Sequence, residues 1–470
     1  MEKIKADLCI IGGGSGGFGA AIRAARQSRN RLSIVVVEQS GFLGGTSTIG
    51  GVNCWEPCIS GPGIHNELYG SLSSNPMYAG MGTYTRFGDP KGYWWGMLEI
   101  DRDMPYTRGL RRKWTGRFCF EPEAMSLEME NLLFACSRLK IMYHTVFTDA
   151  TFNGGRIRSV VVYSAEDKKY LEIEAALFID CSGEIVLARA CGCKTAIGED
   201  ARAEYNEPSA KETPGSNMNG VTQLFRVSPC EEPHVDSLPG WVENTGAREW
   251  AYGKKPDVNI NSYPNGDLSF NILPVMEGNE YHRLPVDQRY RICRSRALMY
   301  WNVYQREVPG FDRYTFKLFS PKIGVRESYR LVGKYVLTEQ DVRAGYIKQN
   351  RKEEIIAFCD HALDNHSDGE GLEEIQLPYG VPFSSLLANE AENLAVACRG
   401  ASFSHIAAST CRLSRVMIAI GEAAGTAAAI AFENNKGFHE VDVGKLRSIL
   451  KIPEFTEKIE QEREYDVVNI

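Results

Sequence analysis

The most constraining feature of this chain is a glycine-rich turn between a short apolar strand and a helix. Residues 6–11 form the expected strand, Gly12-x-Gly14-x-x-Gly17 forms the turn, and an alanine-rich helix follows over residues 20–27. Gly12 permits the tight turn, Gly14 lets the backbone approach a pyrophosphate, and Gly17 lets the helix pack closely on the strand. The helix then begins with its unbonded N–H groups directed at the phosphates. This order predicts a dinucleotide-binding βαβ unit.

A second predicted strand, residues 32–37, ends at Glu38. A carboxylate at this position accepts hydrogen bonds from both hydroxyls of an adenosine ribose, and it repels a 2′-phosphate, which argues against NADP. The spacing of 26 residues from Gly12 exceeds the usual value of about 20. A polar turn over residues 27–31 accommodates the surplus.

Length, charge and cysteine content limit the class of protein. A chain of 470 residues is too long for one compact core, so we expect two domains. A net charge of −7 provides no general attraction to nucleic acid or to an anionic membrane surface. The 13 cysteines are scattered and odd in number, which is typical of reduced thiols and not of a disulfide framework.

The same features bear on location and on metals. The first strand begins almost at residue 1, and no apolar run approaches the roughly 20 residues of a membrane span. We therefore expect a cytoplasmic protein with no membrane partner. No spacing of cysteines and histidines resembles a metal site.

The pattern of elements predicts an α/β fold whose nucleotide-binding domain is discontinuous in sequence. Residues 1–55, 121–200 and 385–435 form this Rossmann-like domain with a parallel sheet, and residues 201–384 form a mixed α+β substrate domain. Residues 56–120 are a lid-like insertion and residues 436–470 a C-terminal extension. The aromatic stretch 84–120 within the insertion is either a lid that stacks on a substrate or a satellite core beneath a long loop.

Three further motifs distinguish between nucleotide cofactors. The first is Phe42-Leu-Gly-Gly-Thr-Ser-Thr-Ile-Gly-Gly-Val-Asn53, the second is Phe178-Ile-Asp-Cys-Ser-Gly-Glu184, and the third runs from Asn393 to Gly400 and on through the helix near Gly421 and Gly425. With these motifs the chain resembles the glutathione-reductase-like FAD superfamily. Within it, the chain is most similar to the FAD-dependent oxidoreductase family that is sometimes labelled heterodisulfide-reductase-like or "xanthan lyase". The resemblance extends through residues 324–333, 336–342 and 379–387.

The resemblance implies FAD bound along these motifs. Because no motif for a covalent linkage stands out in the sequence, we expect the FAD to be bound non-covalently. The residues carried over are Gly12, Gly14, Gly17, Glu38, Gly44, Gly45, Ser182 and Gly183, with Val146 beside the adenine. Neighbours in the same motifs complete the predicted cofactor set: Ser15, Gly16, Gln39, Thr46, Ser47, Thr48, Gly50, Gly51, Cys181, Arg399 and Ser409. A late helix is expected to begin near residues 408–410 and to stabilise negative charge on the reduced flavin by up to about 2 kcal/mol. The chain departs from the family pattern at Glu184, Gly400 and Ala401, which leaves the local contacts open.

His405 and Arg326 are the candidates for catalysis. His405 lies between the expected flavin strand and helix, where an imidazole can move a proton, or it is a histidine that bonds backbone at the start of a helix. Arg326 can anchor an anionic or hydroxyl-bearing substrate, or it forms a salt bridge with Glu327 or another acid. Arg412 and Arg415 are expected to hold FAD or the domain interface.

Residues 53–58, which follow the second glycine segment, supply the candidates for substrate contact. Asn53, Trp55 and Glu56 are predicted to touch substrate, with plain packing as the alternative for Trp55. Cys54 and Cys58 are either a redox dithiol or ordinary thiols. The pair lies farther from Gly45 than in flavin disulfide reductases and the chain lacks a second dinucleotide motif, which favours ordinary thiols.

Taken together, the sequence predicts an FAD-dependent oxidoreductase that transfers a hydride between a small organic substrate and the flavin. The electron donor or acceptor is a separate, unidentified molecule. Two alternatives stay open. The protein is a flavin-dependent lyase or isomerase without net redox change, or a flavin-binding redox sensor without a substrate of its own.

Overall fold

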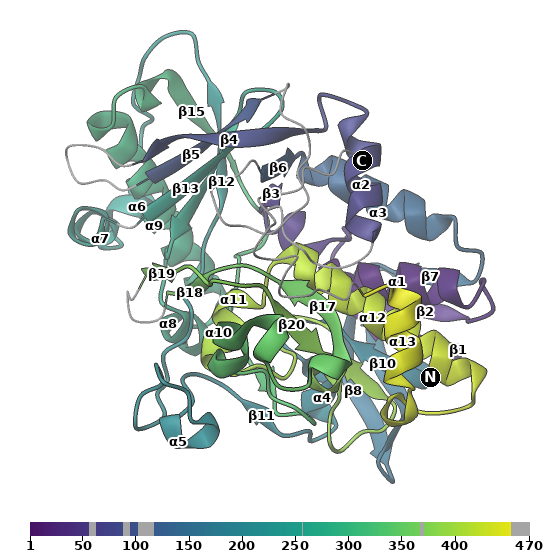
Figure 1. The fold of residues 1–470 in the computed structure, drawn as a ribbon. Helices are drawn as coiled ribbons and strands as arrows, with labels where there is room; N and C mark the ends of the chain where they lie inside the picture. The colour runs from purple at the N-terminus through teal and green to yellow at the C-terminus, as the bar shows by residue number, and fades with distance from the viewer. Residues whose placement is uncertain (56–62, 88–94, 102–116, 256, 367–370, 453–470) are drawn as a thin grey trace.

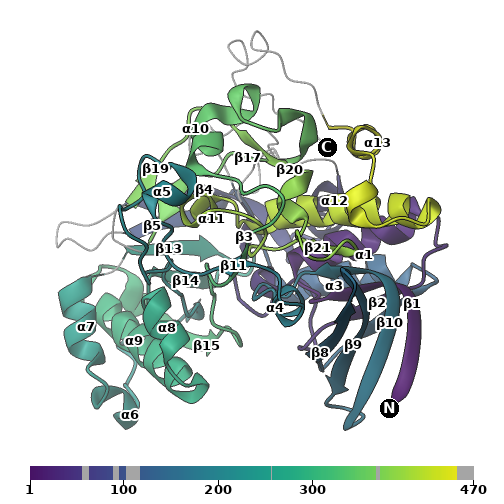
Figure 2. The ribbon, with the colours of Figure 1, turned by 90° about the horizontal axis from the view of Figure 1, so that it is seen from below.

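Two large β-sheets organise the protein. The computed structural model describes residues 1–55, 63–87, 95–101, 117–255, 257–366 and 371–452. One sheet has seven strands and a parallel core, and the other has eight strands. Figures 1 and 2 show them in separate lobes, with helices α1 and α12 on one side and α6, α7 and α9 on the other. The predicted α/β class with a parallel sheet is confirmed.

The seven-stranded sheet contains the N-terminal strand at its centre. Its order is β7 (Leu139–Met142), β2 (Ile34–Val37), β1 (Glu2–Ile11), β10 (Lys169–Asp180), β9 (Arg156–Ser164) and β8 (Thr145–Asn153). Strand β10 runs parallel to β1 along one edge. Along its other edge it pairs antiparallel with β9 at residues 169–174 and parallel with β21 (Leu394–Val396) at residues 178–180. The parallel core therefore unites segments from both ends of the chain.

Helices cover this sheet through close contact between small residues. Helix α1 (Ser15–Gln27) lies against α12 (Ser414–Glu433), and a Cβ on Gly421 would lie 2.1 Å from the Gly16 carbonyl oxygen. The remaining helices of this lobe are α2 (Ile64–Ser73), α3 (Pro122–Phe134), α4 (Val186–Ala190), α11 (His405–Thr410) and α13 (Val443–Leu450). In the described part of the chain, α12 alone has the length and apolarity of a membrane span, and 89% of that window is buried inside the protein, as in a core helix.

The eight-stranded sheet combines two distant segments of sequence. Its order is β15 (Tyr314–Phe319), β12 (Phe225–Pro229), β14 (Leu268–Leu273), β13 (Asp257–Ser262), β5 (Trp95–Asp101), β4 (Ala79–Phe87), β6 (Arg117–Phe120) and β3 (Cys54–Trp55). The described strands of the 56–120 insertion therefore extend the sheet of the 201–384 segment. Residues 88–94 and 102–116, most of the predicted aromatic lid, lie outside the described residues.

Helix α9 (Val286–Glu307) supplies the second hydrophobic core. Its buried face, which includes Tyr300, Trp301 and Tyr304, packs on Phe225 and Phe270 of the eight-stranded sheet. Shorter helices belong to the same core: α6 (Gly240–Glu243), α7 (Ala247–Lys254) and α8 (Gly278–Arg283). Helices α5 (Arg202–Tyr205) and α10 (Glu339–Lys348) lie outside it, and Val342 of α10 packs in the core of the first lobe.

Three two-stranded sheets lie outside the two large ones. They pair β11 (Thr195–Ala196) with β16 (Arg330–Leu331), β17 (Ile355–Cys359) with β20 (Tyr379–Pro382), and β18 (Leu363–Asn365) with β19 (Gly371–Glu373). The cysteines in the described ranges are all free thiols, and most of them are buried.

Candidate functional site

A groove of about 600 Å³ runs along the carboxyl ends of β1, β2 and β10. Ligands of open parallel sheets bind at this edge. Of the residues predicted to bind a dinucleotide, the following line the groove: Gly12, Gly14, Ser15, Gly16, Glu38, Gln39, Gly45, Thr46, Gly50, Val146, Cys181, Ser182, Gly183 and Arg399. The structure therefore brings together segments near residues 12, 45, 182 and 399. We call this space the nucleotide groove.

The first turn of α1 is built to receive a diphosphate. Gly12 has a φ of 97°, and a Cβ there would lie 2.6 Å from the carbonyl oxygen of Cys181. A Cβ on Gly14 would meet no protein atom within 4 Å, so the space beside this residue is open to a ligand. No acidic residue lies in the first turn of the helix. Its unbonded N–H groups thus face an open space, with no acidic side chain on the first turn, and this arrangement suits an anion.

Glu38 lies where a ribose is expected. One carboxylate oxygen accepts a hydrogen bond from Gly13 N–H at 2.7 Å, and the other accepts from Ser40 N–H at 2.8 Å. The Ser40 hydroxyl also donates to the second oxygen, at 2.7 Å. A carboxylate oxygen has two lone pairs, so the oxygen bonded to Gly13 is the one that retains capacity for a ribose hydroxyl. The groove volume is within the range of cofactor sites, and these residues fit an adenine dinucleotide.

Six of the predicted cofactor residues do not line the nucleotide groove: Gly17, Gly44, Ser47, Thr48, Gly51 and Ser409. Several of them support its wall instead. Gly44 N–H donates to the Gly13 carbonyl at 2.9 Å, which joins the two glycine segments. Ser47 accepts from the Trp55 indole at 2.9 Å and bonds Ser414 at 2.8 Å.

The expected start of the late helix was wrong. Residues 408–410 end the short helix α11, and the long helix α12 begins at Ser414. The Ser409 hydroxyl donates to the Ile406 carbonyl within α11. Arg412 and Ser414, in contrast, line the nucleotide groove, so the helix N-terminus at the groove is that of α12.

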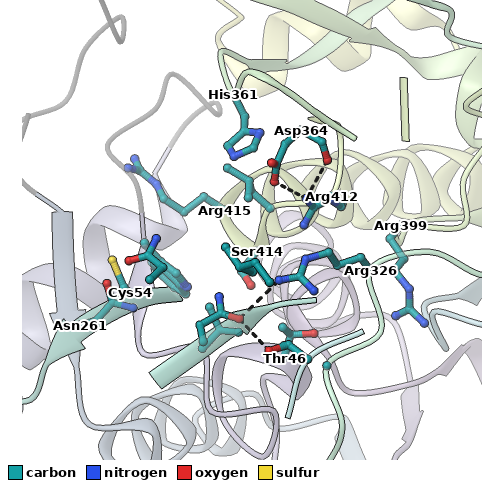
Figure 3. A pocket seen from close by; sticks show the side chains of 18 of the residues that line it. Thr46, Cys54, Asn261, Arg326, His361, Asp364, Arg399, Arg412, Ser414 and Arg415 are labelled. Carbon is teal, nitrogen blue, oxygen red and sulfur yellow. Dashed lines mark hydrogen bonds and ion pairs between the residues drawn. The ribbon is translucent and has the colours of Figure 1, made fainter. Parts of the chain in front are cut away.

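A second cavity, of about 190 Å³, adjoins the groove (Figure 3). The two share Thr46, Gly324, Val325, Arg399, Arg412 and Ser414 in their walls. His361 and Asp364 lie at the top of the cavity in Figure 3, and Thr46 lies at its base. The described lining includes one aspartate and five arginines: Arg117, Arg326, Arg399, Arg412 and Arg415. We call this space the arginine cavity.

Arg326, predicted to anchor substrate, faces the arginine cavity. Its guanidinium donates to the Gly220 carbonyl at 2.9 Å and to Asn271 Oδ1 at 3.4 Å. Burial, together with the charge of Arg412, lowers the pKa of Arg326 to about 9, so the side chain stays a cation at neutral pH. The predicted salt bridge to Glu327 is absent among the described contacts, because Glu327 pairs with Arg330 and His405.

Asp364 is the carboxylate of the arginine cavity, and two partners already engage it. Arg412 donates to it at 2.6 Å and His366 lies 2.8 Å from its other oxygen. Burial alone would raise the pKa of Asp364, but the His366 hydrogen bond and the Arg412 charge hold it well below its usual range. Asp364 is therefore ionised.

His361 also lines the cavity, and sequence reasoning missed it. Its Nδ1 lies 2.8 Å from the Ala362 carbonyl, to which it donates a hydrogen bond. In a neutral ring this bond places the proton on Nδ1. No motif in residues 355–366 signals this position, because the site forms only when this segment meets α12.

The three predicted substrate residues have different positions. Trp55 lines the arginine cavity. Asn53 is fully buried, does not line the cavity, and donates to the Ser262 carbonyl at 3.3 Å. Glu56 lies outside the described residues, as does Cys58. Cys54 does line the cavity, and its partner across the β3–β6 pair is Cys119.

His405 lines neither of these spaces. It borders a separate small cavity with Glu199, Asp200 and Glu207. Its Nδ1 lies 2.8 Å from Glu327, which also pairs with Arg330. Burial alone would lower the pKa of His405, but the Glu327 charge raises it. The structure thus places His405 in a buried network of charges. Within the described ranges no cluster of His, Cys, Asp and Glu could hold a metal ion.

Comparison with known proteins is consistent with this geometry. A family model described as FAD dependent oxidoreductase matches residues 7–450. The sequence matches no curated protein. Among solved structures, a geranylgeranyl bacteriochlorophyll reductase-like protein from Thermoplasma acidophilum is similar with a TM-score of 0.50 at 12% identity, over 96% of this chain and 84% of that one. A triple mutant of a flavin-dependent brominase gives a TM-score of 0.45 at 12% identity, over 95% and 84%. At these identities the likeness concerns the fold alone.

Proposed function

Because the chain belongs to the FAD-dependent oxidoreductase family, we propose that it transfers a hydride between a small organic substrate and FAD. A separate electron donor or acceptor completes the cycle. The observation that supports this reaction is the junction of the two spaces: the arginine cavity opens on the nucleotide groove at Thr46, Gly324 and Ser414. A substrate in the cavity is therefore next to the cofactor site. FAD, the cofactor of the family, supplies the hydride chemistry when bound.

Arg326 binds and orients the substrate in this proposal. Its position is fixed by Gly220 and Asn271, and Asn271 in turn accepts a hydrogen bond from Thr222 at 2.8 Å. A guanidinium held in this way limits the poses that a bound molecule can adopt, which lowers the entropic cost of reaching a reactive geometry. Arg412 is tied to Asp364 and shapes the same wall.

His361 moves the proton that accompanies hydride transfer. It lines the cavity, and an imidazole is the side chain best suited to exchange a proton near neutral pH. We assign this role to His361 in place of His405, since His405 borders neither the cavity nor the groove. The narrower likeness to heterodisulfide-reductase-like proteins stays a prediction.

The direct test follows the visible spectrum of the FAD-loaded protein without oxygen while NADH, NADPH and then a panel of hydroxy acids and sugars are added. Bleaching by an organic compound supports a dehydrogenase, and bleaching by a nicotinamide supports a reductase that passes electrons to the substrate. Substrate turnover with no external acceptor would replace this proposal by a lyase or isomerase. A protein that binds FAD but responds to no compound would favour the sensor.

A separate variant tests the assignment of proton transfer to His361. We expect His361→Gln to slow flavin reduction by the substrate by about 10²–10⁴-fold, the usual contribution of a general acid or base. The matched control is His234→Gln, at an exposed histidine that lines neither space. Equal rates in both variants would remove His361 from the mechanism.

A further inference from the structure

The charges of the arginine cavity point to the class of substrate. Its described lining holds five arginines, and its one aspartate is already shared between Arg412 and His366. Arg399 pairs with Glu184 at 3.0 Å. Among the described residues of the lining, cationic side chains therefore outnumber anionic ones.

Within this lining, Arg326 is an arginine whose positive charge is not compensated by a described carboxylate. Its described acceptors are a carbonyl and an amide, both neutral, and no described carboxylate lies within ion-pair distance of it. Arg326 is partly buried. A cation that is partly removed from water and has no counter-ion is costly, and an anion that enters beside it reduces that cost. A planar guanidinium binds carboxylate and phosphate oxygens in pairs, which gives direction as well as attraction.

A neighbouring wall of the cavity is neutral but polar. Asn259 and Asn261 of β13 and Asn271 of β14 line it, and Asn259 lies directly across from Asn271 in the sheet. Asn261 is 5% exposed, and its side-chain oxygen has no hydrogen-bond partner within the described ranges, as is also true of Asn259. Buried amides are normally satisfied, so these two await polar atoms from a ligand. Whichever way each amide is oriented, it presents either its oxygen or its NH2 group to the cavity, and a hydroxyl group can bond to both.

From these two walls we infer that the substrate is a small hydroxylated organic anion. Its carboxylate or phosphate binds Arg326, and its hydroxyl groups bind the asparagine amides of β13 and β14. This inference rests on the proposed function, because it takes the arginine cavity as the substrate site. It goes beyond that function by specifying the charge and the polar groups of the substrate.

The test measures binding separately from turnover. The FAD-loaded protein is titrated with glycerate, glycerol 3-phosphate, glycerol and propionate, and binding is read from the flavin absorption spectrum and by calorimetry. We expect at least one hydroxylated anion to bind tenfold or more tightly than glycerol and than propionate. Raising potassium chloride from 50 to 300 mM should weaken the binding of that anion and leave glycerol unaffected. The comparison of glycerate with glycerol 3-phosphate distinguishes a carboxylate from a phosphate.

Variants of each wall separate the two contacts. Arg326→Gln should weaken binding of the anion tenfold or more, whereas Arg291→Gln, on the exposed side of α9, should not change it. Asn261→Leu, of similar volume, should reduce affinity for the hydroxylated anion and leave propionate unaffected. Where Arg326→Gln yields no folded protein, Arg326→Lys replaces it, with a smaller expected loss because the charge stays.

The outcomes distinguish the two proposals. Glycerol binding as tightly as both anions, or anion binding that is insensitive to Arg326 variants and to salt, would overturn the substrate class while the hydride-transfer function stands. Anions that bind through Arg326 although no organic compound ever reduces the flavin would support the anion site and reject the proposed reaction.

Discussion

His405 and Glu327 form a buried ion pair, with 2.8 Å between Nδ1 and the carboxylate oxygen. Arg330 contacts the same carboxylate, and Asp200 bonds both Arg330 and the backbone N–H of His405. Four charged groups thus hold the start of α11 against residues 198–200 and 327–330. We expect such a network to act on stability and not on the reaction proposed for the arginine cavity.

We therefore expect His405→Asn to destabilise the protein by about 3–5 kcal/mol, the usual cost of breaking a buried pair, and to leave the rate of flavin reduction nearly unchanged in the folded fraction. Because the folded pKa of His405 is raised, its stabilisation is complete below the ordinary histidine pKa of about 6.5 and declines as pH rises through the folded value. Unfolding free energies between pH 6 and 9 should show this decline in the parent protein and not in the variant. If His405→Asn slowed flavin reduction and left the free energy of unfolding unchanged, His405 would again be a candidate for catalysis.

Glu422 should make the free energy of unfolding depend on pH as well, for a different reason from that of His405. It is fully buried in α12, and burial raises its pKa to about 8 although Arg23 partly opposes the shift. Stability from this group is complete below the ordinary glutamate pKa and is lost as pH rises toward 8. We expect Glu422→Gln to be more stable than the parent at pH 9 by about 1–3 kcal/mol and nearly equal to it at pH 4.5. Glu440→Gln, at an exposed glutamate, is the control, and thermal unfolding at the two pH values is the measurement.

Gly14 offers a clean test of the nucleotide groove. Its backbone is extended and a Cβ there meets no protein atom within 4 Å, so Gly14→Val should fold with a cost of about 1 kcal/mol for a poorer helix cap. The added side chain occupies the space that a pyrophosphate needs, so FAD content should fall at least tenfold. Gly70→Ala, another glycine with open space, should keep its flavin. Full flavin content in Gly14→Val would move the cofactor away from this turn.

Cys54 and Cys119 make a prediction about oxidation. Phe120 N–H donates to the Asn53 carbonyl, so the next pair along β3 and β6, Cys54 and Cys119, is not hydrogen-bonded. Such pairs have Cα atoms about 4.5 Å apart, within the range of disulfides. The Cys54 contact and burial both raise the pKa of Cys119, so we expect linkage to need alkaline pH and a thiol oxidant. Diamide takes up the two electrons and two protons as the bond forms.

Peptide mapping of the diamide-treated protein should identify the Cys54–Cys119 bond. Cys54→Ser should abolish it, and Cys136→Ser, a buried thiol elsewhere, should not. A bond between Cys54 and Cys58 would instead support the dithiol suggested by residues 53–58.

The nucleotide groove was largely predictable because its information is local. Strand, turn and helix follow one another within 30 residues, and the role of Gly12 depends on backbone geometry that no other residue adopts as easily. The error at Ser409 has a physical reason as well. The late helix was expected to begin near residues 408–410, but residues 411–413 interrupt the helical run between α11 and α12. In this break Arg412 bonds the Ser409 carbonyl and Asp364.

The arginine cavity could not be predicted in the same way. Its walls come from β13 and β14, from residues near 326 and 361, and from residues 412–415, which are distant in sequence. Arg326 was selected by its motif, whereas His361 and Asp364 lie in a segment without periodicity or turn signals. Only long-range packing brings these side chains to one space.

One edge of β10 pairs with β9 along its first part and with β21 along its last part, and this arrangement has a consequence for biosynthesis. Residues 178–180 of this strand pair with β21, which lies more than 200 positions later in the chain. While the ribosome still holds residues 394–396, this edge has no partner, and Arg399, Arg412 and Ser414 of the groove wall are not yet in place. Domains with such distant pairings mature slowly and expose unfinished sheet edges to aggregation. Nascent chains should therefore acquire their flavin only after release, and expression with ample riboflavin and chaperones should raise the yield of intact protein.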